Sequence, residues 1–222
     1  MKIMKRKIID LTFPVFEGMM TYPACWHQKV EIAKLGEIRT VGRETCKIIL
    51  GSHTGTHIDA PAHFISNSYG IDKLPLDVLI GKALIVDFKK YRGRKEIALS
   101  DLKMKIKRQK NIERIIFRYD WSEEWGQKTY YINYPYLSLE ACNYLIDLGV
   151  KLVGMDTPSP DGPPNDLEDS PNHKLFLKNN IVLVEYLCNL KSLRKPNIFL
   201  IALPLKIKDT DGSPARVVAY EI

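Results

Sequence analysis

Short apolar runs recur along the chain and are the main guide to its secondary structure. They are rich in Ile, Leu and Val and have the length that is typical of strands. The predicted strands cover residues 8–11, 30–35, 45–50, 82–88, 114–119, 152–155, 181–186 and 198–203. The run 30–35 alternates and 45–50 is rich in strand-forming residues, so we expect these two segments to pair as antiparallel strands.

Helical patterns are fewer. One helix is predicted to begin with Ser100 as its N-cap, and another to follow Ser138, also an N-cap, and to end at Gly149. The apolar stripe of this second helix is made of Leu139, Cys142, Leu145, Ile146 and Leu148. We therefore expect an α/β protein in which a mixed, strand-rich sheet or barrel-like β core has flanking helices.

The chain is expected to form a single domain, residues 1–222, because its length suits one domain and no repeat or low-complexity linker divides it. Hydrophobic residues make up 45% and charged residues 27%, an ordinary globular composition that excludes wholesale disorder. Residues 158–171 stand apart, because they include five prolines and cannot form a helix or a central strand. Such a loop is either a lid over a site or a solvated excursion.

The net charge is +7, from 33 Lys and Arg against 26 Asp and Glu, which raises the question of nucleic-acid binding. The excess is local, since residues 89–114 contain eleven basic residues and three acidic ones. No aromatic RNA-binding motif and no zinc-finger spacing accompanies them. We therefore expect a solvated, lysine-rich helix and no nucleic-acid partner, with a basic binding protein as the alternative.

The cysteines indicate the cellular compartment. They are widely spaced and form no CxxC pair, so neither a zinc ribbon nor a thioredoxin site is indicated. Acidic residues interrupt the stretch that a signal peptide would need, and no apolar run reaches the length of a membrane helix. We expect a cytoplasmic protein with no membrane contact and with reduced thiols at Cys25, Cys46, Cys142 and Cys188.

Histidine is scarce, with five residues in the chain, yet three of them fall within eleven residues. His53, His57 and His63, together with Asp59, form the pattern His-x3-His-x-Asp-x3-His. Given the first histidine, the chance of finding two more at these offsets is roughly 1 in 2,000. The pattern therefore indicates one site rather than separate structural histidines.

The chemistry of this pattern favours a metal. Imidazole nitrogens and a carboxylate are usual ligands of zinc and neighbouring divalent ions. His57 and Asp59 are two residues apart, so both point to one face of an extended segment, and the preceding glycines permit a bend that brings His53 to the same side. A histidine left off the metal is a natural general base and acid, and His63 is the candidate.

His173 and Glu185 extend the set of possible ligands. Glu185 belongs to the otherwise apolar run 181–186, where a carboxylate is unfavourable unless it is paired or bound to a metal. From the residues alone, a strand position that faces solvent or an Arg partner is the simpler interpretation of Glu185.

The sequence resembles the cyclase family of metal-dependent hydrolases, whose best-known members are bacterial kynurenine formamidases. The histidine motif carries the resemblance, and flanking stretches agree with it in order and spacing along nearly the whole chain. These stretches include Ile9-Asp-Leu, Tyr22-Pro, Gly81 to Phe88, Tyr134-Pro-Tyr-Leu-Ser138, Gly154-Met-Asp156, His173-Lys-Leu-Phe and Glu185-Tyr-Leu-Cys-Asn189.

The resemblance implies a cyclase-like swivelling β/α fold and a role for each motif residue. His53, His57 and Asp59 match the family's first metal site, and Asp59 can bridge to a second ion held by His173 and Glu185. His63 matches the catalytic histidine. The ions implied are one or two Zn, with Mn as the alternative, and the proline-rich loop would deliver His173 and cover the site. A homodimer or a larger homo-oligomer is also implied.

The chain departs from the family near its N-terminus. Formamidases of the family carry Tyr/Trp-Pro-Gly-Asp-Pro there, whereas here Tyr22-Pro is followed by Ala-Cys-Trp26-His27. We expect these residues to border the substrate pocket. Trp26 either stacks on an aromatic substrate or packs in the core, and His27 either contacts substrate, adds a ligand or is structural.

The predicted function is hydrolysis of a small formamide or amide by metal-activated water, with N-formylkynurenine of tryptophan catabolism as the leading substrate. Within the family, the alternative is a lactam or lactone hydrolase similar to isatin hydrolases. Outside it, the alternatives are a catalytically idle metal-binding protein and the basic binding protein introduced above.

Overall fold

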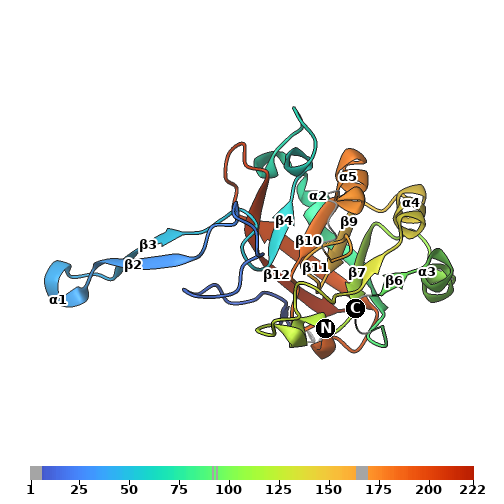
Figure 1. The fold of residues 1–222 in the computed structure, drawn as a ribbon, viewed down its shortest axis with the longest axis horizontal. Helices are drawn as coiled ribbons and strands as arrows, with labels where there is room; N and C mark the ends of the chain where they lie inside the picture. The colour runs from blue at the N-terminus through green and yellow to red at the C-terminus, as the bar shows by residue number, and fades with distance from the viewer. Residues whose placement is uncertain (1–6, 92, 94, 164–169) are drawn as a thin grey trace, which may run out of the picture.

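The computed structural model describes residues 7–91, 93, 95–163 and 170–222. Its centre is a closed ring of seven strands, with helices on one side and a long hairpin on the other (Figure 1). The strands of the ring are β4 (His57–Asp59), β5 (Ile80–Asp87), β7 (Arg114–Arg118), β9 (Leu152–Met155), β10 (Val182–Glu185), β11 (Asn197–Pro204) and β12 (Gly212–Glu221). The other strands are β1 (Ile9–Asp10), β2 (Glu31–Gly36), β3 (Thr45–Ile49), β6 (Glu96–Ile97) and β8 (Tyr136–Leu137).

The ring joins a parallel half to an antiparallel half. Strands β5, β7, β9 and β10 are parallel neighbours, whereas β11 pairs antiparallel with both β5 and β12. The short β4 pairs antiparallel with β10 and with β12 and so closes the ring. The predicted barrel-like, mixed β core is therefore confirmed.

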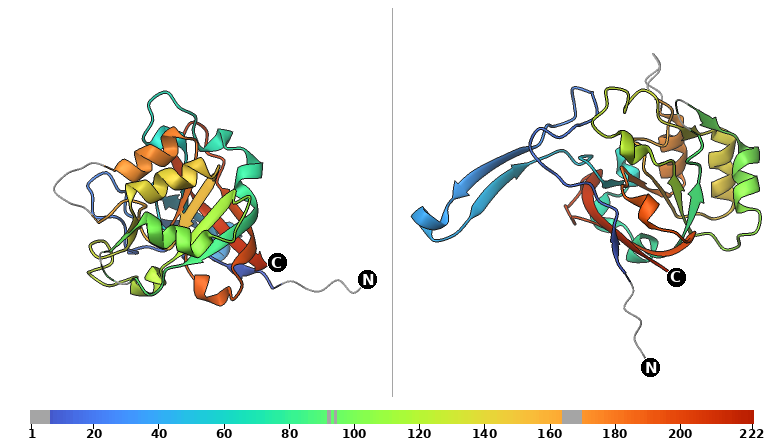
Figure 2. Two further views of the ribbon diagram at one scale, coloured as in Figure 1. Left: turned by 90° about the vertical axis from the view of Figure 1, so that its right-hand side faces the viewer. Right: turned by 90° about the horizontal axis from the view of Figure 1, so that it is seen from below.

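The crossovers of the parallel half are helical, as the geometry of parallel strands requires. In the chain, α3 follows β5, α4 follows β7 and α5 follows β9, and all three cover the outer face of the barrel (Figures 1 and 2). The α-helices are α1 (Ile38–Val41), α2 (Leu76–Leu79), α3 (Leu99–Ile106), α4 (Leu139–Asp147) and α5 (Pro171–Lys178). Four 3-10 turns are η1 (Pro61–His63), η2 (Ile71–Lys73), η3 (Trp121–Glu124) and η4 (Leu190–Ser192).

Two apolar clusters lie on the two sides of the barrel wall. Ile58, Ile116 and Val184 belong to the cluster that fills the barrel, whereas Ile115 and Leu183 pack with the helices outside it. This is the alternation of inward and outward side chains that strands impose. It means that residues two positions apart on β4 or β10 share a face.

Each predicted strand has its counterpart, but β12 and the short β4, β6 and β8 were not predicted as strands. The N-cap prediction for Ser138 is confirmed, because its Oγ accepts a hydrogen bond from the Ala141 amide at 3.2 Å. The N-cap prediction for Ser100 is wrong. The N-cap of helix α3 is Ala98, two residues earlier, and the helix begins at Leu99, so Ser100 lies in the first turn.

The apolar stripe predicted for α4 is only partly buried. Cys142 and Leu145 are buried together with Ala141, whereas Leu139 and Leu148 at the helix ends are exposed. The helix therefore contacts the barrel through its middle turns.

Strands β2 and β3 form the predicted antiparallel pair, joined at the tip by α1. We call residues Glu31–Ile49 the arm. It projects away from the barrel into solvent (Figures 1 and 2). No residue of α1 is buried.

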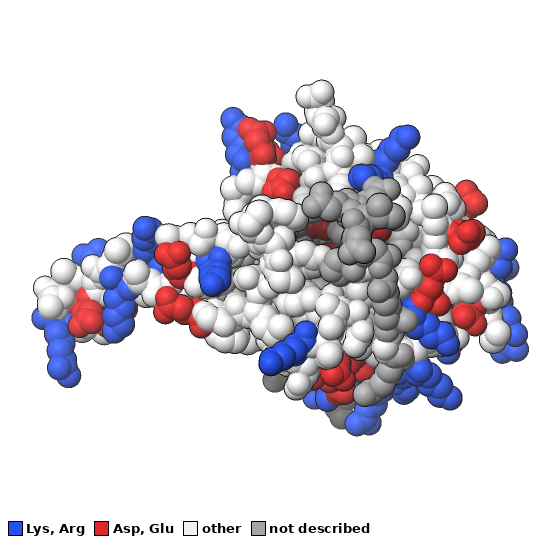
Figure 3. Space-filling model, viewed as in Figure 1, with Lys and Arg blue, Asp and Glu red and all other residues white. Residues whose placement is uncertain are grey.

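The described residues of the basic stretch 89–114 are largely solvated, with Lys103 and Lys105 exposed on α3. Arg114 is the exception, because it is buried and donates hydrogen bonds to the carbonyls of Val78 at 2.8 Å and Lys82 at 3.3 Å. On the face shown in Figure 3, basic and acidic side chains are interspersed. Within the described residues, no helix has both the length and the apolar character needed to cross a membrane.

Candidate metal centre and active site

Strand β4 sets the direction of the first two motif side chains. Its middle residue, Ile58, fills the barrel, so His57 and Asp59 on either side of it point outward. On the neighbouring strand β10, Glu185 lies directly opposite His57. Its carboxylate Oε2 is 3.4 Å from His57 Nε2.

This register explains the carboxylate in the apolar run. Val182 and Val184 fill the barrel, and Leu183 and Glu185 face outward. Glu185 is buried against histidines, so the interpretation that it faces solvent or an Arg partner is wrong.

His173 reaches the same point from α5. The helix begins at Pro171, which suits the first helical position, and His173 lies in its first turn. His173 Nε2 is 3.2 Å from Glu185 Oε1 and 3.7 Å from Asp59 Oδ2. Its other ring nitrogen, Nδ1, donates to Asp161, whose carboxylate also accepts the backbone amides of Asn172 and His173.

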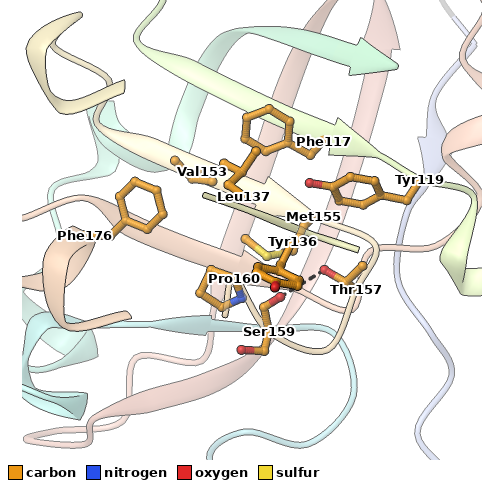
Figure 4. Close-up of a pocket in the computed structure, with 10 residues that line it drawn as sticks. All are labelled: Phe117, Tyr119, Tyr136, Leu137, Val153, Met155, Thr157, Ser159, Pro160 and Phe176. Atoms are coloured by element: carbon orange, nitrogen blue, oxygen red, sulfur yellow. Dashed lines mark hydrogen bonds between the residues drawn. The ribbon is translucent and has the colours of Figure 1, made fainter. Parts of the chain in front are cut away.

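Asp161 was not predicted to act at the site, although it lies in the proline-rich loop. The described part of this loop packs over an apolar pocket rather than into solvent (Figure 4). Thr157 Oγ1 donates to the Ser159 carbonyl at 3.1 Å, and a Cβ on Gly162 would lie 2.9 Å from the Tyr136 ring. These contacts hold Asp161 in place, while residues 164–169 of the loop lie outside the described residues.

His53 comes from the turn before β4. Gly55 in this turn has φ +60, a conformation that favours glycine. His53 Nδ1 is 2.8 Å from Asp59 Oδ1, and its Nε2 is 2.7 Å from Asp211 Oδ2. Asp211 directly precedes β12 and was not predicted from the sequence.

The donor atoms fit a divalent cation. Both carboxylate oxygens of Asp59 and Oε1 of Glu185 are buried and accept no hydrogen bond. The imidazole nitrogens that face them lie 2.8 to 3.7 Å away, and ligands of a tetrahedral zinc ion are about 3.3 Å apart when the bonds are about 2.0–2.1 Å. In each of these histidines the second ring nitrogen makes a hydrogen bond of its own. His57 Nδ1, for example, donates to the Gly55 carbonyl at 2.7 Å.

The electrostatics of the cluster favour positive charge. Burial alone would lower the pKa of His53, but the Asp59 and Asp211 carboxylates outweigh it and raise that pKa to about 10. Burial likewise opposes the rise in the pKa of His173 to about 10, which the hydrogen bond to Asp161 and the nearby carboxylate of Glu185 cause. Burial and the nearby Asp59 charge raise the pKa of Glu185. A bound cation would relieve this repulsion between carboxylates.

His63 lies beside the cluster, in the 3-10 turn that follows β4. Its ring centroid is 3.9 Å from that of His53 and 5.9 Å from that of His173. Its side chain is 26% exposed, more than that of any proposed ligand. Its Nδ1 is 3.1 Å from Asp211 Oδ2.

The structure brings two of the three predicted pocket residues close to the cluster. The ring centroids of Tyr22 and His27 are 5.3 Å apart. Burial and, to a smaller extent, the charges of Glu185 and Asp161 raise the pKa of Tyr22. The His27 ring is 6.4 Å from that of His53, and burial with the neighbouring histidines lowers the pKa of His27 to about 4. Trp26 is 73% exposed, which excludes the alternative that it packs in the core.

An aromatic wall beside the cluster was not predicted. The ring of Tyr131 packs edge-on against that of Tyr22, with ring centroids 5.5 Å apart. The ring centroids of Tyr186 and His57 are also 5.5 Å apart. The backbone of Tyr186 is in the left-handed region, with φ +53. Residues 119–136 are rich in Tyr and Trp, which was the available signal for this wall.

Comparisons with known proteins agree with this geometry. The family described as "Putative cyclase" matches residues 9–162. The kynurenine formamidase of Bacillus cereus (strain ATCC 14579) is 31% identical over 219 residues, which cover 96% of this chain and 97% of that protein. The kynurenine formamidase of Bacillus anthracis is 31% identical over 97% of this chain and 98% of its own length.

Solved structures are similar over almost the whole chain. Isatin hydrolase A from Labrenzia aggregata has a TM-score of 0.86 and 25% identity, and the match covers 97% of this chain and 93% of that one. A predicted metal-dependent hydrolase from Bacillus stearothermophilus has a TM-score of 0.80 and 26% identity, covering 99% and 100% of the two chains. By sequence and by fold, this chain belongs to the cyclase family of metal-dependent hydrolases.

Proposed function

We propose that this protein hydrolyses a small formamide or related amide with the help of one or two divalent ions. The proposed ligands are His53, His57, Asp59, His173 and Glu185, with Asp59 as the bridge. The observation that carries the proposal is a set of buried carboxylate oxygens that accept no hydrogen bond, beside a more exposed histidine. Zinc is the first candidate and manganese the second, because the donors are imidazole and carboxylate.

His63 is the proposed catalytic base and acid. A bound divalent ion would polarise the substrate carbonyl and lower the pKa of water to about 7. With Nδ1 of His63 directed at Asp211, its Nε2 can accept a proton from the attacking water. The same nitrogen then protonates the leaving nitrogen as the C–N bond breaks, which gives formate and a free amine from a formamide.

N-formylkynurenine is the leading substrate, supported by the kynurenine formamidase relatives and by the aromatic side chains of Tyr22 and Tyr131 near the cluster. A lactam such as isatin is the second candidate. It is supported by the similarity to isatin hydrolase A and by the absence of Gly-Asp-Pro after Tyr22-Pro. Trp26 and His27 stand where the formamidase motif is lost and are the proposed specificity residues.

A substrate panel with metal analysis tests this function. Purified protein is expected to contain about one or two zinc or manganese ions per chain and to hydrolyse N-formylkynurenine or another formylated aniline faster than isatin and simple lactones. Dialysis against a chelator should abolish turnover, and added zinc should restore it. Absence of metal would contradict the proposal, and turnover of isatin alone would favour the lactam alternative.

A homodimer is part of the proposal, and the arm supports it. An isolated two-stranded hairpin is only marginally stable in water. The arm nevertheless exposes apolar side chains, with Leu35 68% and Ile38 65% accessible, and Ile32 lies across from the exposed Ile48. A second copy of this chain is the occupant that would bury these side chains symmetrically.

Substitution of the arm tests the dimer. We expect the double variant Leu35→Ser, Ile38→Ser to shift a wild-type dimer to monomer at equal concentration, as measured by sedimentation equilibrium. The matched control is Met104→Ser on α3, which is 64% exposed but far from the arm in sequence, and it should remain dimeric. A monomeric wild type, or a double variant that stays dimeric, would refute the role of the arm.

A cytoplasmic location completes the proposal. All four cysteines are free, which is usual for proteins of a reducing compartment.

A further inference from the structure

Asp211 reaches the cluster from the side of β4 that faces β12, whereas Glu185 reaches it from β10. The backbone carbonyl of Asp211 accepts a hydrogen bond of 2.9 Å from the amide of Ala60, the residue directly after β4. The β4–β12 pairing therefore fixes the Asp211 backbone next to the histidine motif, although 148 residues separate Asp211 from His63 in the chain.

One oxygen of Asp211 contacts two imidazoles. Oδ2 lies 2.7 Å from His53 Nε2 and 3.1 Å from His63 Nδ1, and the two rings are tilted by 32°. The next residue, Gly212, packs closely against the His53 ring. A Cβ at this position would lie only 2.8 Å from His53 Cε1. Both rings are therefore held by the same two-residue segment.

These contacts determine which ring nitrogens carry protons. An ionised carboxylate accepts hydrogen bonds and donates none, so each nitrogen that faces Asp211 must be an N–H. An aspartate carboxyl is ordinarily ionised near neutral pH. If an ion were bound at His53 Nδ1, which faces Asp59 at 2.8 Å, the remaining ring proton of His53 would stay on the Nε2 that faces Asp211. A neutral His63 whose Nδ1 carries the proton presents a bare Nε2.

We propose that Asp211 is a positioning residue that sets the tautomers of His53 and His63 together. It thereby prepares one imidazole as a metal ligand through Nδ1 and the other as a proton acceptor through Nε2. A single carboxylate thus couples retention of the ion to proton transfer. The second half of this inference rests on the proposed function, and the first half does not.

The first test measures tautomers and metal affinity without any substrate. Long-range 1H–15N correlation spectra of the zinc-loaded wild type are expected to show Nε2–H for His53 and Nδ1–H for neutral His63. In Asp211→Ala, the Nδ1–H form of His63 should lose its preference, and zinc affinity should fall about 10–100-fold by chelator competition. Asp211→Asn keeps the shape of the side chain but not its charge. Its zinc affinity and its His63 tautomer preference should lie between those of the wild type and Asp211→Ala.

The matched control is Asp209→Asn, in the same loop, where the exposed carboxylate pairs with Lys73 and asparagine tolerates the positive φ of the position. It should leave zinc affinity and both tautomers unchanged. Unchanged His63 tautomers or unchanged zinc affinity in Asp211→Ala would overturn the inference.

The second test is a double-mutant cycle at saturating zinc. Asp211→Asn is expected to lower kcat at least 10-fold in the wild type, with less change in KM, and to have no further effect on kcat in a His63→Ala background. Additive losses would show that Asp211 does not act through His63. If the wild type hydrolyses no amide, the proposed function fails, yet the tautomers and zinc affinity still decide the role of Asp211.

Discussion

A His63→Ala variant is expected to keep its metal and to lose about 10²–10⁴-fold in kcat, the usual contribution of general acid–base catalysis. The reason is the position of His63, which is beside the proposed ligands but more exposed than they are and is tied through Nδ1 to Asp211. Alanine would remove the proposed proton-transfer group and leave the proposed ligands of the ion unchanged. Metal content by elemental analysis and kcat at saturating zinc measure the two halves of this result.

His63→Gln is the companion variant, because glutamine keeps polar atoms near the same place but cannot carry a proton between water and the leaving nitrogen. It should be as impaired as His63→Ala. Activity within about 10-fold of the wild type in either variant would assign proton transfer to another group.

Asp59→Ala is expected to abolish both metal binding and turnover, with a loss of zinc affinity greater than the about 10–100-fold that outer partners contribute. Asp59 lies between three imidazoles, with Oδ1 2.8 Å from His53 Nδ1 and 3.2 Å from His57 Nε2, and Oδ2 3.7 Å from His173 Nε2. Its removal takes away the carboxylate that all three share. Zinc content after dialysis and competition titration with a chelator give the measurement.

A buried aspartate elsewhere provides the control for Asp59. Asp156 is equally buried, but its carboxylate accepts the backbone amides of Tyr119 and Trp121. Asp156→Asn should therefore retain its metal. Full metal occupancy in Asp59→Ala would refute the bridging role proposed for this residue.

The local part of the site was predictable because its chemistry is written in adjacent residues. His53, His57, Asp59 and His63 fall within eleven positions, and the period of a strand is enough to orient two of them. Whether they bind metal stays a prediction until metal analysis is done. The barrel-like β core was predictable because the apolar runs have the length of strands and alternate with fewer helices.

The remote part was not predictable from patterns in the chain. Glu185 acquires its meaning only from the β4–β10 register, which sets it opposite His57. Asp211 is brought in by β12, a strand whose first residues include Gly212 and Pro214 and therefore resemble a turn. Helix α5 is only eight residues long and was not predicted, so the direction of His173 could not be derived either.

The arm shows a different limit. Its two strands and their antiparallel pairing were predicted, and the pairing is confirmed. Periodicity describes which residues share a face but not what covers that face. The projection of the arm away from the barrel therefore came only from the three-dimensional structure (Figure 2).

The alternation along β4 and β10 has an evolutionary consequence. Ile58 and Val184 fill the barrel, whereas His57 and Glu185 face away from it. We therefore expect mutations in the barrel interior to act mainly on stability, and mutations around Tyr22 and His27, the proposed pocket residues, to act mainly on the choice of substrate. If this holds, the substrate can change through residues outside the barrel while the interior that determines stability is left as it is.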